Sequence, residues 1–427
     1  MNNSSILLDD LPTDWEAKKI KYVFEERKEV NNPVKTDVLV SLTHDRGVIL
    51  HSDKGDIGNK EKDDLTKYKI VHPGDIVVNS MNVIIGSSGL SQYYGLVSPV
   101  YYMLTKVDPL FDNKFFHYLF RSIVFQKSLI GVGNGILEHR MRVPMDKLGS
   151  HRIPLPSSKE QKLISRYLDK KTEQIDLLVE KIQKKIELLK KQRISLINQC
   201  VTKGLDPNVE MKDSGVEWIG EIPSHWEITK LKYSGKVIIG LSFDKEDVVD
   251  PDTGTLVLRS SNVQGGKVVF DDNLWVKTVV PEKLHTKIGD ILICTRNGSR
   301  NLIGKNCLLG DESLGMTWGV FMTVFRSNVP NFFHWILNSQ VFKSQSGLYL
   351  TSTINQLTVS TLENLTFPFI EDPVEQKSII DFLDETTSQI DQSIGNENKR
   401  ITLLKEYRQS LISSVVTGKV RVTEDMI

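Results

Sequence analysis

Residues 160–204 read EQKLISRYLDKKTEQIDLLVEKIQKKIELLKKQRISLINQCVTKG, and residues 375–419 read EQKSIIDFLDETTSQIDQSIGNENKRITLLKEYRQSLISSVVTGK. The two stretches align without a gap at a spacing of 215 residues, and nearly half of the aligned positions are identical. Similarity of this extent within one chain indicates an internal duplication. The sequence therefore predicts two related halves.

The first stretch carries an apolar residue at every seventh position, which is the pattern of a helix that packs along another helix. The second keeps this pattern except at residues 395–397, Gly-Asn-Glu, which interrupt it. Leu168, Ile175 and Ile182 lie on this row in the first stretch, and Leu383 and Ile390 lie on it in the second. At a rise of 1.5 Å per residue, each helix would be about 65 Å long, more than the core of a small domain can cover. We therefore expect two rod-like helices.

The charges of the two helices favour pairing between them. Residues 159–203 hold twelve Lys and Arg and six Asp and Glu, whereas residues 371–419 hold six basic and nine acidic residues. Unlike helices attract and like helices repel. The long connection lets the second helix run back along the first, so we expect an antiparallel coiled coil within one chain. Two independent surface helices are the alternative, which the length of the segments disfavours.

The duplication extends beyond the helices. Each half begins with a Pro and Trp motif followed by Lys-x-Lys-Tyr, and later has a Gly-Asp pair, at Gly74 and Gly289, before a short apolar run. This pair predicts a tight turn into a buried strand. We predict an α+β fold in which two globular domains are separated by two long helices, with an internal pseudo-two-fold repeat. The predicted segments are 1–156 (first globular domain), 157–204 (first long helix), 205–222 (linker), 223–371 (second globular domain) and 372–427 (second long helix and tail).

Composition and motifs give no sign of catalysis. The chain has 54 basic and 54 acidic residues, so any nucleic-acid site has to be a local patch. Its three cysteines lie far apart without histidines in ligand spacing, which argues against a disulfide framework or a zinc site. Residues 298–306 lack the spacing of a phosphate-binding loop, and residues 131–135 lack the last glycine of a dinucleotide fingerprint. We expect a non-catalytic cytoplasmic protein with no cofactor or metal of its own.

The run KDSGVEWIGEIP at residues 212–223, the Ile-Pro-Leu-Pro entry at residues 153–156 and the Glu-Gln-Lys helix starts resemble the specificity subunit of type I restriction-modification systems. The resemblance covers the whole chain. It implies target-recognition domains that each read one half of a bipartite DNA sequence. It also implies two methyltransferase subunits that use S-adenosylmethionine, and restriction subunits that use ATP and magnesium. A coiled-coil scaffold that binds proteins is the alternative function.

Polar loops of the globular domains are the candidate DNA readers, because Arg, Asn, Gln, Ser and Thr side chains can bond to base edges. One loop follows the Gly-Asp strand of each domain, and another precedes the entry into the long helix. The candidates are Asn79, Ser80, Asn82, His139, Arg140 and Arg142 in the first domain, and Arg296, Asn297, Ser299, Arg300, Asn301, Thr351, Ser352, Thr353, Asn355 and Gln356 in the second.

A second apolar face near the end of each long helix is a candidate partner surface. It consists of Ile194, Ile197, Val201, Ile412 and Val416. The family resemblance implies that methyltransferase subunits pack there. Contact with the chain's own globular domains is the alternative, since a neighbouring domain would cover the same stripe equally well.

If the paired helices set the distance between the domains, removing one heptad from each should shorten the preferred spacer of the DNA site. Deleting residues 180–186 together with residues 395–401 keeps the heptad register and shortens each helix by about 10 Å. This change corresponds to about 3 bp of DNA, and it also rotates one half-site, so we expect weaker binding with a shorter optimum. Affinity for a ladder of spacers would reveal the shift. An identical optimum in both proteins would show that another feature sets the distance.

Overall fold

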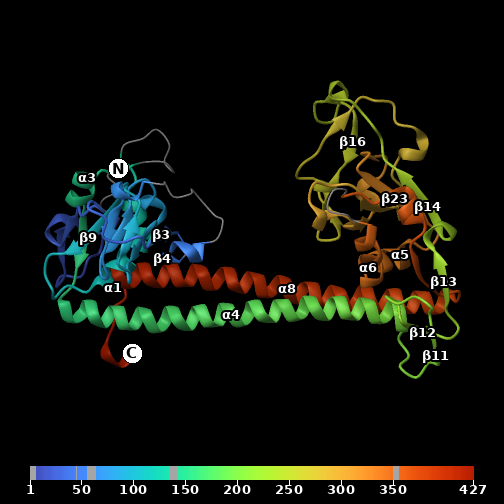
Figure 1. The fold of residues 1–427 in the computed structure, drawn as a ribbon. Coiled ribbons are helices and arrows are strands. Elements are labelled where there is room, and N and C mark those ends of the chain that lie inside the picture. Colours follow the sequence, from blue (N-terminus) through green and yellow to red (C-terminus); the bar gives the residue numbers. More distant parts are fainter. Residues whose placement is uncertain (1–5, 45, 55–63, 134–141, 350–354) are drawn as a thin grey trace. The chain divides into compact units, whose positions relative to one another are not determined.

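The computed structural model describes residues 6–44, 46–54, 64–133, 142–349 and 355–427. It divides into two units, one formed by residues 1–183 with 398–427 and the other by residues 184–397. Each unit holds one globular domain and part of each long helix, α4 (Ser158–Lys203) and α8 (Pro373–Val416) (Figure 1). Each unit therefore combines residues from both halves of the sequence.

The first unit contains an antiparallel sheet with the strand order β2-β9-β6-β7, surrounded by the strand pairs β1-β10, β3-β4 and β5-β8. The aromatic face of α1 packs between this sheet and α4, where Phe115 and Phe116 are fully buried with Leu168. The elements are β1 (Glu16–Lys19), β2 (Phe24–Arg27), β3 (Val40–Thr43), β4 (Gly47–Leu50), β5 (Lys69–Val71), β6 (Ile76–Asn79), β7 (Ser88–Leu90), β8 (Gly95–Val97), β9 (Tyr101–Lys106), α1 (Asn113–Arg121), α2 (Ile123–Ser128), α3 (Met145–Ser150) and β10 (Arg152–Leu155).

The second unit repeats this design with the strand order β14-β23-β20-β21, and it adds a second four-stranded sheet with the order β15-β19-β16-β22. Phe332 and Phe333 of α5 take the places of the first unit's buried phenylalanines. The elements are β11 (Met211–Asp213), β12 (Glu221–Pro223), β13 (Glu227–Lys230), β14 (Gly235–Ile239), β15 (Val248–Val249), β16 (Thr255–Leu258), β17 (Val263–Gln264), β18 (Lys267–Val268), β19 (Trp275–Val276), β20 (Ile291–Cys294), β21 (Asn306–Leu308), β22 (Thr317–Trp318), β23 (Met322–Ser327), α5 (Pro330–Leu337), α6 (Gln340–Tyr349), α7 (Val359–Glu363) and β24 (Thr366–Phe369).

The Gly-Asp pair makes the turn that the sequence predicted. Gly74 has φ +94°, a conformation that glycine adopts without steric cost. The buried carboxylate of Asp75 accepts the backbone N–H of His72 (2.9 Å) and pairs with Arg27 of β2 (Nε to Oδ2, 2.9 Å). The second unit has the same turn at residues 287–290. In each unit the Gly-Asp motif therefore ties the turn before a buried strand to an arginine on another strand of the four-stranded sheet.

The two long helices run antiparallel in the second unit. Arg193 of α4 pairs with Asp391 of α8 (3.0 Å), and Lys185 pairs with Glu397 (2.5 Å). Residue numbers rise along α4 as they fall along α8. The more exposed pair, between Arg193 and Asp391, contributes little stability, whereas Glu397 is buried; both pairs oppose other registers.

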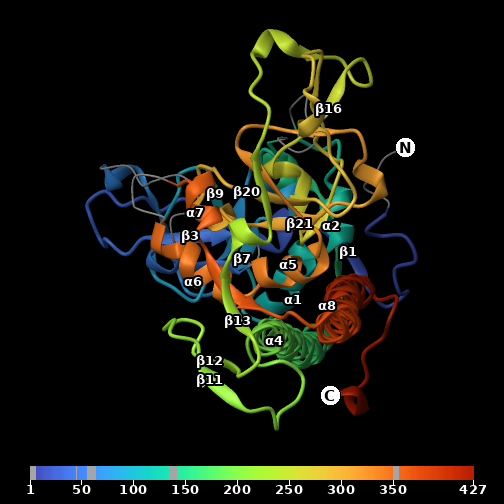
Figure 2. The ribbon, with the colours of Figure 1, turned by 90° about the vertical axis from the view of Figure 1, so that its right-hand side faces the viewer.

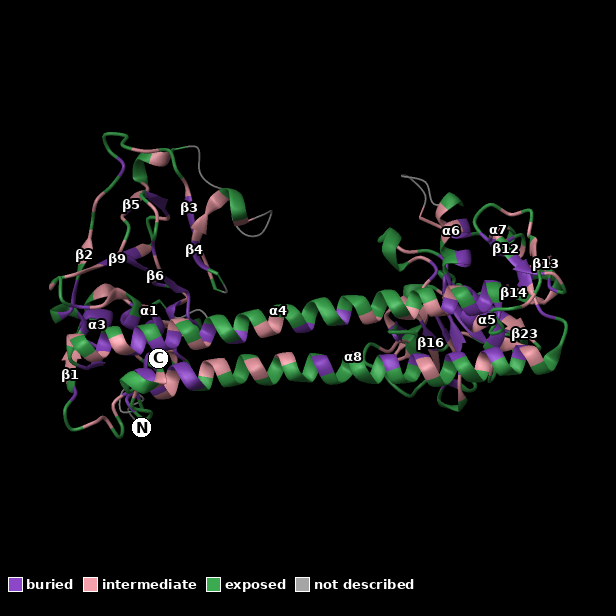
Figure 3. Cartoon of the chain, turned by 90° about the horizontal axis from the view of Figure 1, so that it is seen from below, coloured by how far each residue is buried: buried purple, intermediate pink, exposed green. Residues whose placement is uncertain are grey.

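The first unit shows the same antiparallel pairing. Arg408 of α8 pairs with Asp176 of α4 (Nε to Oδ1, 3.2 Å), and Lys159, near the start of α4, pairs with Glu424, beyond the end of α8 (3.2 Å). Buried positions recur along one face of each helix (Figure 3), and Ile182 of the predicted heptad row is among them. The predicted antiparallel coiled coil is confirmed in each unit.

A tryptophan joins each globular domain to the ends of both long helices. In the first unit the Trp15 indole N–H donates to Glu160 at the start of α4 (3.2 Å). Gly418, just beyond α8, has φ +75°, and a Cβ there would lie 2.4 Å from Pro12. Only glycine fits this approach. Arg421 donates to Glu160 (2.7 Å) and closes what we call the first helix-end junction.

The second helix-end junction repeats this chemistry. The Trp226 indole N–H donates to Glu375 at the start of α8 (3.1 Å), and His225 also contacts this carboxylate (2.9 Å). Gly204, just beyond α4, has φ +71°, and a Cβ there would lie 3.3 Å from the Trp226 ring. Each junction therefore binds the start of one long helix and the end of the other.

The Glu-Gln-Lys motif also fixes the start of α4. Ser157 caps α4 as predicted, because its hydroxyl accepts the Glu160 N–H (3.3 Å); the Glu160 carboxylate accepts the Ser157 hydroxyl (3.2 Å), so one of the two bonds of the predicted capping box is formed. The buried Gln161 donates to Pro156 O and accepts the Asp112 N–H, both at 2.9 Å. The first two motif residues therefore have structural roles.

The segment predicted as a linker is partly ordered. Strands β11 and β12 form an antiparallel hairpin next to the end of α4 (Figure 2). Ile219 and Ile222 from this segment are buried in the core that contains Trp226. The hairpin therefore belongs to the second globular domain, because its two isoleucines complete that domain's core.

The predicted partner face is largely buried within the chain, so this part of the prediction is wrong. Its buried members, each no more than 2% exposed, are Ile197, Val201, Ile412 and Val416. The first two pack in the core with Trp226, and the other two pack in the core with Trp15. Antiparallel pairing brings the end of each long helix under a globular domain. Ile194 alone remains exposed.

We expect Ile197→Asp to destabilise the second unit by about 3 kcal/mol or more, because it places a charge in an apolar core. Leu188→Asp is the matched control, since Leu188 lies on the same helix and is 65% exposed. The control should change stability by less than about 0.5 kcal/mol. Urea unfolding of the full chain measures both. Equal losses would contradict the burial of Ile197.

Two histidines are half-buried at equivalent positions of α1 and α5. Burial lowers the pKa of His117 to about 4, with nearby Arg121 as a further cause. Burial also lowers the pKa of His334 to about 4, with nearby Arg193 as a further cause. His117 accepts the Leu90 N–H through Nδ1 (3.2 Å). The folded protein therefore favours the neutral form of both rings.

Stability should consequently fall as the pH drops from about 6.5 towards 4. The unfolded chain takes up protons over this range while the folded rings stay neutral, which costs about 1 kcal/mol per histidine between pH 7 and 5.5. Below about pH 4 this contribution levels off. We expect the double variant His117→Asn and His334→Asn to lose less stability on acidification. Urea unfolding at several pH values measures the slope, and parallel slopes would refute the assignment.

Candidate nucleic-acid interface

The loop after β6 is the first candidate reader segment of the first domain. Asn79 accepts the Met81 N–H through its side chain (3.0 Å), which tightens the turn, and Asn82 is half-buried. Ser80 is fully buried, and its hydroxyl donates to Val100 O (2.9 Å). The prediction that Ser80 contacts DNA is therefore wrong, because its hydroxyl holds the loop to the neighbouring strand.

The second candidate segment lies beside the first. The Val143 N–H donates to Ser80 O (2.9 Å), so two segments about 60 residues apart meet at the end of β6. Arg142 is exposed at this position. His139 and Arg140 lie outside the described residues. The structure therefore brings Arg142 next to the loop after β6, as a shared reading surface requires.

The second domain has the same backbone arrangement after β20. The Leu357 N–H donates to Thr295 O (2.8 Å), and the Thr295 hydroxyl donates to Phe321 O (3.2 Å). Arg296 and Gln356 face each other as an isolated antiparallel bridge. Each of the two hydrogen bonds has its counterpart in the first domain. The duplication therefore extends to the backbone of the candidate site.

These contacts define three equivalent positions in each domain, which we call the strand-end site. The first follows the strand β6 or β20, the second immediately precedes β9 or β23, and the third lies before α3 or α7. They are occupied by Met81, Val100 and Arg142 in the first domain and by Arg296, Phe321 and Gln356 in the second. Gln356 is half-buried and the other five are exposed. The sequence prediction did not include Met81, Val100 or Phe321.

The strand-end site of the second domain borders a cleft of about 930 Å³. Fourteen residues line it: Phe243, Arg259, Ser260, Ser261, Asp272, Leu274, Arg296, Asn297, Gly298, Gly319, Val320, Phe321, Met322 and Asn355. Arg296, Asn297 and Asn355 were among the predicted readers. Arg259 was missed, because nothing in the local sequence places its strand beside the loop after β20.

Two predicted readers in this domain use their side-chain amides in hydrogen bonds within the protein. Asn297 donates to the Ser260 hydroxyl (2.9 Å) and accepts the Ser299 N–H (3.0 Å), so its amide is engaged at both ends. Asn355 donates to Gly298 O (3.3 Å). These side chains shape the cleft and are less free to read bases.

The remaining predicted readers differ in accessibility. Arg300 is exposed and makes one long contact to Gly347 O (3.4 Å), while Ser299 and Asn301 are exposed at the surface. The predicted readers that lie outside the described residues of this domain are Thr351, Ser352 and Thr353.

The cleft carries more positive than negative charge. Arg259 is held by Asp272 (2.9 Å), and the Lys305 ammonium donates to Val263 O (3.0 Å) beside the cleft wall. The Arg296 guanidinium lies over the Phe321 ring, 5.0 Å from its centre. Two cations, Arg259 and Arg296, against the one carboxylate of Asp272 leave the lining of the cleft with a net positive charge, which attracts phosphate.

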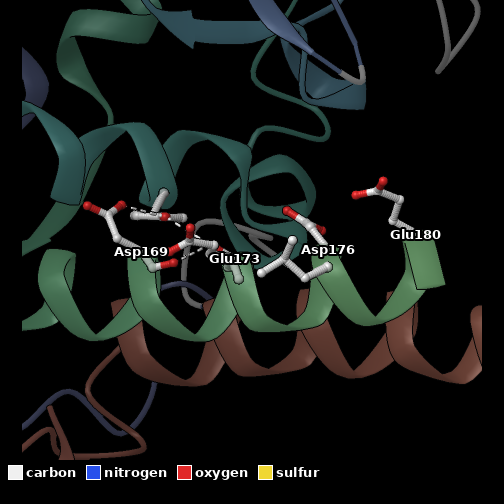
Figure 4. A pocket seen from close by; sticks show the side chains of 7 residues that line it. Asp169, Glu173, Asp176 and Glu180 are labelled. Atoms are coloured by element: carbon white, nitrogen blue, oxygen red, sulfur yellow. Dashed lines mark hydrogen bonds between the residues drawn. The ribbon is translucent and has the colours of Figure 1, made fainter.

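A second pocket, of about 370 Å³, has the opposite charge. Figure 4 shows Asp169, Glu173, Asp176 and Glu180 along one face of α4 beside the first globular domain. Tyr118 donates to Asp169 (2.8 Å). No group of His, Cys, Asp and Glu in the described part of the chain has the geometry to hold a metal ion. This acidic face would repel phosphate, so it is not a nucleic-acid interface.

Residues 12–188 match the family described as type I restriction modification DNA specificity domain. This segment belongs to that family. The matched segment contains the whole strand-end site of the first domain and about the first two thirds of α4. The second globular domain is related to the first by the internal duplication.

The similarity to specificity subunits extends along almost the entire chain. The putative type I restriction enzyme MjaX specificity subunit of Methanocaldococcus jannaschii is 24% identical over 97% of this chain and 96% of its own length. The type I restriction enzyme MjaVIII specificity subunit of the same organism is 26% identical over 84% of this chain and 83% of its own length. The type I restriction enzyme EcoKI specificity subunit of Escherichia coli is 26% identical over 47% of this chain and 44% of its own length.

Solved structures confirm the fold of the specificity subunits. A chain from a structure that addresses complex assembly and conformational transition of the type I R-M system has a TM-score of 0.74, covering 96% of this chain and 100% of that chain at 14% identity. The HsdS subunit from Thermoanaerobacter tengcongensis has a TM-score of 0.53 at 15% identity, covering 96% and 98%. No helix among the described residues is long and apolar enough to cross a membrane.

Proposed function

We propose that this chain is the DNA-recognition subunit of a type I restriction-modification complex, and that each globular domain reads one half of a bipartite site. The proposal depends on one observation: the two strand-end sites share a backbone arrangement but differ in all three side chains. Two surfaces with the same backbone and different exposed side chains are suited to reading two different DNA sequences. The names of the related specificity subunits support the same function.

The cationic cleft favours DNA over a protein partner as the ligand of the second domain. Arg296 and Arg259 line a cleft that also holds polar Asn and Ser side chains. Phosphate contacts from such cations position a protein on DNA, and base contacts from the same surface supply specificity. A scaffold that binds proteins alone would not require this pairing of cations with hydrogen-bonding groups.

We propose that the chain performs no catalysis and that S-adenosylmethionine, ATP and magnesium bind to partner subunits. The cysteines support this proposal, because burial raises the pKa of Cys200 to about 11 and the pKa of Cys307 to about 12. Thiols with raised pKa values are poor nucleophiles at neutral pH. The side chains of the strand-end sites are also of the kinds that bind and orient DNA in this proposal, and none of them is given a catalytic role.

We propose that two methyltransferase subunits bind to the long helices at equivalent places. Leu188 of α4 is 65% exposed, and Leu403 of α8, its counterpart at the repeat spacing of 215 residues, is 63% exposed. Exposed leucines at matching positions of a duplicated helix offer two alike surfaces to one kind of partner. In this proposal Leu188 and Leu403 take the role of partner surface, which the sequence had predicted for a face that is largely buried.

A hybrid chain tests the proposed function. Replacing residues 211–371, which include the β11–β12 hairpin, with a second copy of residues 6–156, which include Leu7, keeps each domain's own core residues together with its tryptophan. We expect this hybrid to select an inverted repeat of the first half-site, because both domains would then present Met81, Val100 and Arg142. Selection from a random duplex library at fixed salt measures the preference.

The reciprocal hybrid, with two copies of the second domain, is the matched control and should select an inverted repeat of the other half-site. Thermal unfolding of both hybrids verifies that the grafted domain is folded. A folded hybrid that still selects the original bipartite sequence would overturn the assignment of one half-site to each domain.

A further inference from the structure

The two strand-end sites hold different side chains at the same two backbone positions. In the second domain these positions are taken by the cation Arg296 and the aromatic Phe321, and in the first by the apolar Met81 and Val100. The equivalence follows from hydrogen bonds, since the carbonyls of Val100 and Phe321 each accept a hydroxyl from the residue before the first position. A difference between the domains at these positions therefore changes the surface without changing the scaffold.

Arg296 is placed to present a flat, oriented pair of donors. Its backbone N–H donates to Phe321 O (3.1 Å), and its guanidinium lies 5.0 Å from the Phe321 ring centre. Among the described residues, no carboxylate pairs with it, whereas Arg259 in the same cleft is held by Asp272. Stacking on an aromatic ring limits the rotation of the guanidinium and leaves its outer N–H groups free.

A guanidinium presented in this way fits one base in the major groove. Guanine offers O6 and N7 as two neighbouring acceptors, which match the two-pronged donor edge of arginine. Phe321 is 52% exposed, so it can support the guanidinium from one side while its far face stays at the surface. The Asn297 amide already makes two hydrogen bonds within the protein, so it is not free to bond to a base.

The first domain offers a contrasting surface. Met81 and Val100 are exposed apolar side chains directly beside the buried Ser80, and neither can donate or accept a strong hydrogen bond. In the major groove the apolar feature of a base pair is the C5-methyl group of thymine. An apolar pair at a base-reading position therefore matches thymine, and it penalises bases whose polar edges would lose water there.

We propose that these two positions decide one base pair in each half-site, with Arg296 and Phe321 selecting guanine and Met81 and Val100 selecting thymine. The inference rests on the proposed DNA-reading function. It specifies which residues read one base pair of each half-site and which base they select. The same scaffold then reads different sequences by exchanging two exposed side chains.

Reciprocal grafts in the full-length chain test the inference. One variant carries Arg296→Met with Phe321→Val, and the other carries Met81→Arg with Val100→Phe. Each protein selects from a random duplex library at fixed salt. We expect the first graft to lose guanine at one position of the second half-site and to prefer thymine there, and the second graft to do the reverse in the first half-site. The loss for the original base should be about 10- to 100-fold.

Three further proteins separate base reading from other roles. Arg296→Lys keeps the charge but removes the two-pronged donor edge, so it should lose most of the guanine preference. Arg296→Ala should lose that preference without gaining thymine. Arg166→Met removes an exposed cation from α4, outside the strand-end site, and should leave every preference unchanged. Thermal unfolding shows whether each variant is folded.

The outcomes are distinct. A wild-type chain that selects no sequence would overturn the proposed function together with this inference. Folded grafts that keep the wild-type bases would overturn the inference alone. Equal weakening on all sequences, with a salt dependence lowered by about one charge, would assign Arg296 to a phosphate and also overturn it. A switched base at one position per half-site, with the other positions retained, would support the inference.

Discussion

The helix-end junction is the contact on which the rest of the structure depends. In the second unit, one tryptophan donates its indole N–H to Glu375 and packs against Gly204, so a single side chain joins two helices whose ends are far apart in sequence. The first unit uses Trp15 and Glu160 in the same way. Antiparallel pairing follows from these contacts, because each domain has to hold the start of one long helix and the end of the other.

The candidate interface shows how a duplicated scaffold supports two different surfaces. Backbone hydrogen bonds, such as that from Val143 to Ser80, hold the strand-end site, and backbone groups are the same for every residue type. Side chains at its exposed positions are therefore free to differ. The buried positions are not free, and Ser80 and Thr295 retain a hydroxyl for the same bond in both domains.

The sequence predicted the parts of this structure that are local and periodic. The heptad row, the Ser157 cap of α4 and the Gly-Asp turn each involve residues close to one another in sequence, and the structure confirms them. Periodicity identified Ile197 as part of an apolar face, but it does not show what covers that face. Arg296 was found because it follows a recognisable strand. Phe321 and Val100 were missed because each immediately precedes a strand that pairs with the one before the first position, and local pattern does not encode which strands pair.

The first unit is discontinuous in sequence, and this affects how the chain is made. Its core combines Leu7 and Trp15 with Ile412 and Val416, whereas the second unit is one unbroken stretch, residues 184–397. On the ribosome, the amino-terminal domain emerges first but lacks part of its interior until residues 411–416 have been translated. The second unit has all its residues earlier and can fold first. The amino-terminal domain thus exposes apolar surface until the end of the second long helix has been made, so its core can be completed only after all residues of the second unit are present.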